Sequence, residues 1–269
     1  MHVMNFLSQK EMLSLVDVNA YSIIEYLLRK VTFSQPELSN NNQKNSGIQI
    51  TKEFLEQWIV QACDLKSIGS GNYPIDVYKE NEYGTVEKFV SAGVDKKGQL
   101  LNSQSNETSL GQNFQGFGKY LDQAFENKDY DKILNGWIKI LKDKLSKPFT
   151  QLNLHTIYYF IFIRSGNKIC LAISKLDLDY IQNLTVKKTS PTSVFVDNFL
   201  NPKYGEVKIY KSKKRMELRL YAKKLQENNL LITWDFKNLK PSIVSLREIA
   251  QKNQLNDHIN SEFQKFFDT

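Results

Sequence analysis

Two short apolar runs near the middle of the chain constrain its fold more than any other feature. Residues 157–163 and 168–173 are rich in β-branched and aromatic side chains, and a polar stretch with Gly166 lies between them. Runs of this composition favour β-strands, and the glycine favours a tight turn between them. The sequence therefore predicts a β-hairpin that belongs to a central sheet.

Helical patterns surround this hairpin. Apolar residues recur at helical spacing over residues 4–30, over 51–65 with Thr51 as the N-cap, and over 129–146, where Pro148 is expected to end the helix. The polar segment that begins at Ser105 is expected to open another helical region. Paired strands between helices predict an α/β or α+β fold, in which a central mixed β-sheet is flanked by helices.

The composition fits a globular protein. The 269 residues are 41% hydrophobic, and the two cysteines, Cys63 and Cys170, are far apart in the sequence. No apolar run reaches the roughly 20 residues that cross a bilayer. The first residues also lack the basic and apolar segments of a secretory signal. These features predict a cytoplasmic protein with reduced thiols and no membrane contact.

Basic residues gather in one segment towards the C-terminus. Residues 203–224 contain nine lysines and arginines but two glutamates, in a chain with a net charge of +7. Strand-like alternation on either side of a turn at 212–214 predicts a hairpin that can lay cations along DNA phosphates. Its candidate DNA-binding residues are Lys211, Lys213, Lys214, Arg215 and Arg219. The alternative is a solvated charged surface without a ligand.

A second polar pattern occupies residues 69–90. Two strand-like runs, 75–79 and 85–90, flank a turn that contains Gly84. Asp76 lies at the start of the first run and Lys88 lies on the second. Carboxylates hold divalent cations, and a lysine can orient water or offset the charge of a phosphate. The pattern therefore indicates a hydrolytic site that uses a metal ion.

This hairpin resembles that of the PD-(D/E)xK nuclease superfamily, and within it the type II restriction endonucleases. Pro74, Asp76 and Lys88 correspond to the proline, the first acid and the lysine of the motif, although Ile75 separates the proline from the acid. The resemblance implies a restriction-endonuclease-like core. In that family a helix before the hairpin often carries a further glutamate, for which Glu56 is a candidate together with Glu53.

This chain departs from the motif at the position of its second acid. It lies two residues before the lysine, and this chain has Val86 there. Side chains alternate along a strand, so Val86 and Lys88 share a face and Glu87 points to the other. The acid is therefore missing, replaced by Glu87 through a β-bulge, or supplied from elsewhere.

The resemblance implies a sequence-specific endonuclease that hydrolyses phosphodiester bonds of double-stranded DNA with Mg²⁺, or an inactivated form of one. Asp76, Glu87 and Lys88 would be catalytic, and Asp76 and Glu87 would bind the metal. Asn106 and Ser109 would lie near the scissile phosphate, unless they only cap a helix. A homodimer is also implied, because palindromic sites mirror the two-fold axis of a protein dimer.

Three regions follow from this reading. Residues 1–50 would form an N-terminal helical region, 51–175 the nuclease-like core, and 176–269 a C-terminal DNA-recognition region, all within one compact domain. Two other functions fit the same sequence. The chain could be a non-catalytic DNA-binding protein of the same fold, or a protein-interaction module whose basic segment only aids solubility.

Overall fold

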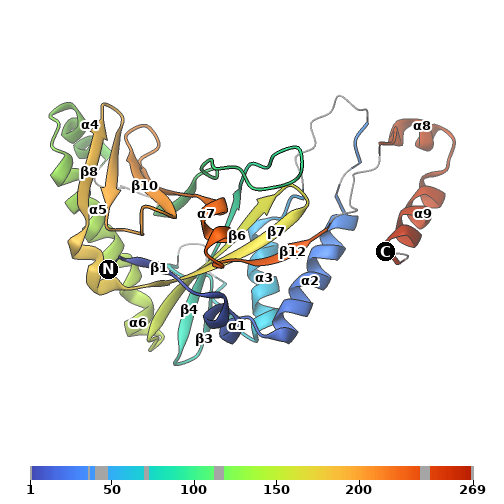
Figure 1. Cartoon of the computed structure of the whole chain (residues 1–269), viewed down its shortest axis with the longest axis horizontal. Coiled ribbons are helices and arrows are strands. Elements are labelled where there is room, and N and C mark those ends of the chain that lie inside the picture. Colours follow the sequence, from blue (N-terminus) through green and yellow to red (C-terminus); the bar gives the residue numbers. More distant parts are fainter. Residues whose placement is uncertain are drawn as a thin grey trace.

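Two β-sheets and the helices packed around them form the structure (Figure 1). The computed structural model describes residues 2–35, 37–39, 48–69, 73–111, 118–236 and 243–267. The larger sheet has seven strands in the order β1-β7-β6-β4-β3-β2, and β12 pairs with β7 beside β1. These strands are β1 (Met4–Phe6), β2 (Lys66–Ser67), β3 (Val77–Lys79), β4 (Tyr83–Ser91), β6 (Thr156–Ser165), β7 (Lys168–Leu176) and β12 (Ile232–Asp235).

The predicted central hairpin is confirmed. Strands β6 and β7 pair antiparallel, and Gly166 adopts a φ of +61° in the turn between them, a conformation that costs glycine little. Strand β4 pairs with β6 in parallel along its whole length. Because it contains both kinds of pairing and is flanked by helices, the sheet confirms the mixed α/β class that the sequence predicted.

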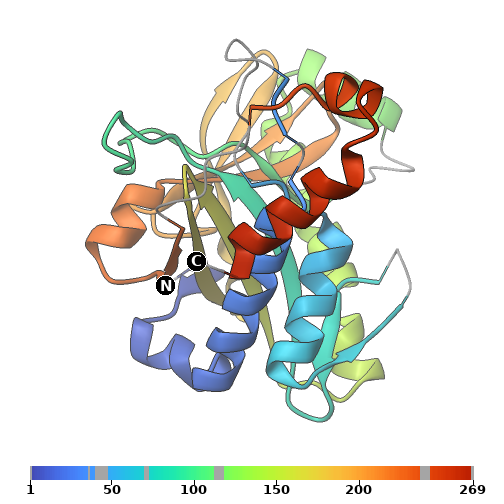
Figure 2. The same cartoon turned by 90° about the vertical axis from the view of Figure 1, so that its right-hand side faces the viewer.

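Three helices cover one face of the larger sheet (Figure 2). They are α1 (Gln9–Leu15), α2 (Val18–Phe33) and α3 (Lys52–Cys63). The N-cap predicted at Thr51 is present, since its hydroxyl accepts a hydrogen bond of 3.3 Å from the backbone N–H of Phe54. Apolar residues of α3 such as Leu55 and Ile59 are buried in one cluster with Phe160 and Phe162 of β6.

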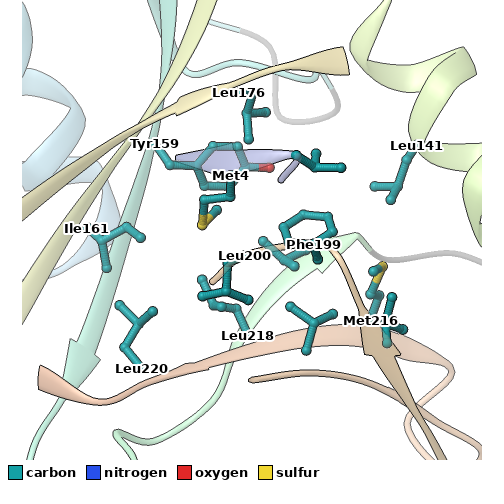
Figure 3. Close-up of a cluster of buried hydrophobic side chains, with 14 of the residues drawn as sticks. Met4, Leu141, Tyr159, Ile161, Leu176, Phe199, Leu200, Met216, Leu218 and Leu220 are labelled. Atoms are coloured by element: carbon teal, nitrogen blue, oxygen red, sulfur yellow. The ribbon is translucent and has the colours of Figure 1, made fainter. Parts of the chain in front are cut away.

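The opposite face of the larger sheet packs against a second sheet and helix α5 (Tyr130–Leu145). The second sheet has the order β5-β11-β10-β9-β8. In Figure 3, Tyr159 and Ile161 of the larger sheet face Leu218 and Leu220 of the smaller one. The strands of the second sheet are β5 (Thr108–Gly111), β8 (Thr185–Ser190), β9 (Ser193–Asp197), β10 (Gly205–Tyr210) and β11 (Arg215–Leu220).

Five further helices and a 3₁₀ helix lie in the described part of the chain. They are α4 (Gly118–Glu126), α6 (Lys147–Gln151), α7 (Ala222–Glu227), α8 (Leu246–Gln251) and α9 (Leu255–Phe267), with a 3₁₀ helix at Leu178–Asn183. Figure 1 shows that α8 and α9 extend to one side of the two sheets. None of the helices within the described ranges is both long enough and apolar enough to cross a membrane.

Two predicted elements are wrong. Residues 4–6 are not helical, because they pair with β7 as β1. The segment after Ser105 does not open a helix, because residues 108–111 pair with β11 as β5; the end of the predicted segment, at 112–114, lies outside the described residues. The helix predicted over 129–146 is confirmed as α5, which ends at Leu145, and Pro148 lies in the first turn of α6, where its missing N–H is tolerated.

Candidate active site at the start of strand β3

The candidate site lies where two strands of the larger sheet part. Strand β3 pairs with β4 only at residues 83–85, whereas β4 continues to Ser91. Asp76 immediately precedes β3, and its backbone N–H donates to the carbonyl of Thr85 at 2.9 Å. Its carboxylate Oδ2 accepts from the backbone N–H of Glu87 at 3.0 Å. The Asp76 side chain is therefore fixed against the edge of β4 where β3 begins.

Residues 86–88 point alternately to the two faces of the sheet. Val86 is 5% exposed and belongs to the apolar cluster that includes Leu141 of α5. Glu87 is 1% exposed and, by strand alternation, leaves β4 on the face covered by α3. The pairing of β4 with β6 has no register shift, so the β-bulge considered for Glu87 is wrong. Glu87 nevertheless lies beside Asp76, because Asp76 bonds to its backbone.

The Glu87 carboxyl group is buried and incompletely bonded. The Thr85 hydroxyl donates a hydrogen bond to its Oε1, while its Oε2 is buried without a hydrogen-bond partner. Burial, and then the nearby charge of Asp76, raises the pKa of Glu87 well above the ordinary glutamate value. When it carries a proton, Glu87 can donate a hydrogen bond to the Asp76 carboxylate; when it is ionised, its Oε2 is stable only with a cation beside it.

Helix α3 adds a lysine and a glutamate that complete one side of the site. The Lys52 ammonium lies 2.8 Å from Asp76 Oδ1 and 2.9 Å from Glu56 Oε1. Burial alone would lower the pKa of Lys52, but its hydrogen bonds to these two carboxylates outweigh burial and raise that pKa. Glu56 was a candidate from the sequence, whereas Lys52 was missed. Its position beside the N-cap, four residues before Glu56, was the available signal.

Two further lysines contribute positive charge near Asp76. Lys88 on β4 and Lys144 on α5 both have a lowered pKa, first because of burial, while the Asp76 carboxylate opposes that change. Within the described residues, neither ammonium group forms an ion pair with an acidic side chain. Lys144 was also missed by sequence reasoning, because it is far from the hairpin in the chain. Only the packing of α5 brings its charge towards Asp76.

Asp76 and Glu87 are the two carboxylates of the site that could hold a Mg²⁺ ion. Throughout the described ranges, no group of three or more His, Cys, Asp or Glu side chains is arranged to hold a metal. Mg²⁺, however, is commonly bound by one or two protein carboxylates, with water completing its shell. Asp76 lies next to Glu87, whose buried Oε2 lacks a partner. A cation here would satisfy that atom and favour the ionised form of Glu87.

The basic segment forms the predicted hairpin, but most of its charge is compensated. Strands β10 and β11 pair antiparallel. Acidic residues from elsewhere in the chain lie against its cations: Glu107 pairs with Lys213 and Arg219, Asp122 lies 3.3 Å from Lys214, and Glu126 lies 3.5 Å from Lys211. Arg215 is exposed and has no acidic partner among the described residues. The nine-to-two excess in the sequence therefore overstates the free positive charge.

Asn106 and Ser109 lie away from Asp76. Neither caps a helix: the Asn106 side-chain carbonyl accepts from the backbone N–H of Ser91 at 2.6 Å, and the Ser109 hydroxyl donates to the carbonyl of Gly111 at 3.1 Å. Ser91 is four residues beyond Glu87 on β4, which corresponds to about 13 Å along the strand. Asn106 thus lies at the other end of β4, Ser109 belongs to β5 of the second sheet, and the capping interpretation is wrong.

Comparisons with known proteins identify no relative of this chain. The chain matches no protein-family model, no curated protein and no solved structure. A function for the chain therefore has to be argued from its own residues and their geometry.

Proposed function

We propose that this protein is a Mg²⁺-dependent nuclease that hydrolyses phosphodiester bonds of double-stranded DNA. One observation carries the proposal: Glu87 is buried beside Asp76 with an unsatisfied carboxyl oxygen. Two lysines without acidic partners among the described residues lie near the same carboxylate. Unsatisfied buried acids next to uncompensated cations are typical of catalytic sites. The motif of Asp76 and Lys88 in the sequence independently favours this reaction.

Asp76 and Glu87 are the residues that would hold the metal. When bound, Mg²⁺ would lower the pKa of a water molecule and offset charge on the phosphate. The Thr85 hydroxyl keeps the Glu87 carboxyl in place through Oε1, and Lys52 does the same for Asp76 through Oδ1. Supporting contacts of this kind orient metal ligands and increase their affinity for the ion.

Lys88 leaves β4 on the face opposite to Glu87 and would act on the phosphate from that side, where its charge interacts with that of Asp76. Its ammonium group would orient the attacking water or stabilise the negative charge that develops as the phosphodiester bond breaks. A half-buried lysine without an acidic partner in the described structure has its donors available for this role. Lys144 would add a second positive charge to the same substrate group.

Recognition of DNA by the basic hairpin, and action as a homodimer on a palindromic sequence, are further parts of the proposal. They follow from the resemblance to type II restriction endonucleases. Arg215 is the leading contact, because it is exposed and unpaired within the described residues. Lys211, Lys213, Lys214 and Arg219 would have to exchange their acidic partners for phosphates, which lowers their net contribution.

A non-catalytic DNA-binding protein is the second candidate. It is favoured by Val86, which occupies the motif position of the second acid and is buried in the apolar core. A valine provides no oxygen for a cation, so metal affinity in that case would depend on two carboxylates alone. The same DNA contacts would then serve binding without hydrolysis.

A cleavage assay on plasmid and linear duplex DNA, with and without Mg²⁺, tests the proposal. We expect Mg²⁺-dependent discrete fragments, and a rate about 10²- to 10³-fold lower for Asp76→Asn, the range for loss of one group that stabilises a transition state. Glu80→Gln is the matched control, since Glu80 is an exposed residue of the same hairpin paired with Lys66. Retention on DNA without cleavage would favour the second candidate. Absence of both would favour a protein-interaction module.

A further inference from the structure

A surface cavity lies at the far end of the larger sheet from Asp76. Its volume is about 260 Å³, and three segments of the chain line it: the loop after β4, the turn region of β6 and β7, and helix α7. The loop and α7 lie next to each other in Figure 2. The lining residues are Gly98, Gln99, Leu100, Ser165, Lys168, Cys170, Lys223 and Gln226. They include two lysines and no acidic residue.

The positive charge of the cavity is only partly compensated. Lys223 is half-buried and forms no ion pair among the described residues, although its charge acts on Glu227 of the same helix. Lys168 lies 3.4 Å from Asp235, a neighbour across β7 and β12 that is not part of the lining. The two lysines that line the cavity thus form one ion pair between them, that of Lys168 with Asp235. An anion would lower the free energy of both charges.

Neutral donors complete the lining. Lys223 and Gln226 are three residues apart, so they share one face of α7. Gln99 lies at the rim on the facing loop, and neither its side-chain amide nor that of Gln226 is hydrogen-bonded within the described part of the protein. The cavity therefore offers two lysines, one of them paired with Asp235, and two side-chain amides that are not hydrogen-bonded within the described residues.

The cavity is separate from the candidate active site. Val86, next to the Asp76 carboxylate, pairs with Tyr159 on β6, whereas Ser165 lies six residues further along that strand. Six residues of a strand correspond to about 20 Å. A ligand of this cavity would not occupy the site at Asp76.

We propose that the cavity binds a phosphate group, either free or as the monoester of a small molecule. A phosphate carries up to two negative charges and has at least three acceptor oxygens, which matches two ammonium groups and two amides better than a single carboxylate does. Since a water molecule occupies about 30 Å³ in the liquid, the volume has room for the phosphate and a small organic group, not for duplex DNA.

Equilibrium dialysis with radiolabelled inorganic phosphate, at constant ionic strength, tests the site. We expect saturable one-to-one binding that is at least tenfold weaker in Lys223→Gln. Lys224→Gln is the matched control, because Lys224 is the next residue of α7, pairs with Glu227 at 2.8 Å and does not line the cavity. Lys88→Gln should bind phosphate as the unmodified protein does, which excludes binding at the candidate active site.

The dialysis experiment has outcomes that support the phosphate site and outcomes that exclude it. No saturable binding, equal affinity in Lys223→Gln, or loss of binding in Lys88→Gln would overturn the site. Competition by glycerol phosphate would support a monoester as the ligand, and its failure to compete would support free phosphate. Gln226→Leu provides a second variant if Lys223→Gln does not fold, and we expect it to weaken binding as well.

Discussion

The candidate active site and the basic hairpin β10–β11 both concentrate charged side chains, but they balance that charge differently. At the candidate site, Glu87 Oε2 is buried without a partner, and Lys88 has no ion-pair partner within the described residues. In the hairpin, Lys213 and Arg219 both contact Glu107. The candidate site thus keeps buried charged groups without partners, whereas in the hairpin most cations are paired and Arg215 is an exposed exception.

This difference shows why charge counted along a sequence is a poor guide to charge available on a surface. Glu107 is 112 residues from Arg219, and Glu126 is 85 residues from Lys211. No window of the sequence contains these pairs. Exposed pairs also contribute little to stability, about 0–1 kcal/mol each, so their main effect here is to offset positive charge. Unsatisfied groups in a partly buried site are the better indicator of function.

Loss of Lys88 should have the largest effect. We expect Lys88→Gln to lower the rate of Mg²⁺-dependent DNA cleavage about 10²- to 10³-fold, because a charge that stabilises the transition state is lost. The free energy of unfolding should not fall, since the variant removes a half-buried charge without an acidic partner. Cleavage rates and urea unfolding measure the two effects. Lys66→Gln is the control, because Lys66 is exposed and paired with Glu80.

The result would be contradicted if Lys88→Gln cleaved at the normal rate. A lower cleavage rate accompanied by a lower free energy of unfolding would instead indicate a structural role for Lys88. The candidate site and the basic hairpin would then no longer differ in holding an uncompensated functional charge.

Glu87 should make stability depend on pH. Its raised pKa means that the folded protein keeps a proton that the unfolded chain releases above about pH 4.3. The stability from this proton is complete below that pH and is lost as the pH rises towards the pKa of the folded state. The slope is at most about 1.4 kcal/mol per pH unit. Urea unfolding of Glu87→Gln without metal should show a flatter pH profile.

Mg²⁺ should reverse this loss in the unmodified protein. Binding at a concentration 100 times the dissociation constant stabilises a protein by about 2.7 kcal/mol, and Glu87→Gln should lose most of that gain. Glu53→Gln is the control, since Glu53 is exposed on α3. Equal stabilisation of both variants by Mg²⁺ would exclude Glu87 as a ligand.

Lys144 should affect substrate binding more than the chemical step. We expect Lys144→Gln to raise KM for duplex DNA about tenfold, with a smaller change in kcat, because one charge-assisted contact to a phosphate is lost. Steady-state cleavage kinetics measure both constants. Lys142→Gln, an exposed residue of the same helix, should behave normally. Identical kinetics for the two variants would remove Lys144 from the site.

The smallest effect is expected in the basic hairpin. Arg215→Gln should reduce the salt dependence of DNA binding by about one unit of slope, the value for one lost phosphate contact. Lys213→Gln should change it less, since Lys213 already contacts Glu107 and Glu217. Binding titrations over a salt series test both. An equal reduction of the salt slope in both variants would mean that DNA displaces the acidic partners of Lys213. The charges of the basic hairpin would then be as available in the DNA complex as those of the candidate site.

Long elements were predictable from local pattern, and short ones were not. Strands β6 and β7 and helix α5 have enough residues for their periodicity to be clear. Strands β1 and β5, with three and four residues, are too short for a pattern. They are strands because β7 and β11 offer them backbone partners, which is a property of the sheet and not of the segment.

The residues of the candidate site also fall into those that local sequence predicted and those that it did not. Asp76 and Lys88 were found from a motif within one hairpin. Lys52 and Lys144 were missed, because helix packing brings them to Asp76 from outside that hairpin. Strand alternation in the sequence predicts which face of the sheet Glu87 points to. It does not show that the Asp76 carboxylate accepts a hydrogen bond from the Glu87 backbone.

The sequence by itself determined which residues form the central strands and which side chains share a face, because both depend on interactions within a few residues. The tertiary structure alone decided which charges are satisfied. Coulomb interactions and burial act through space, so a residue's partner can come from any distance along the chain. Glu107 thus offsets charge in the basic hairpin, whereas Glu87 Oε2 is buried where no donor of the described protein reaches it.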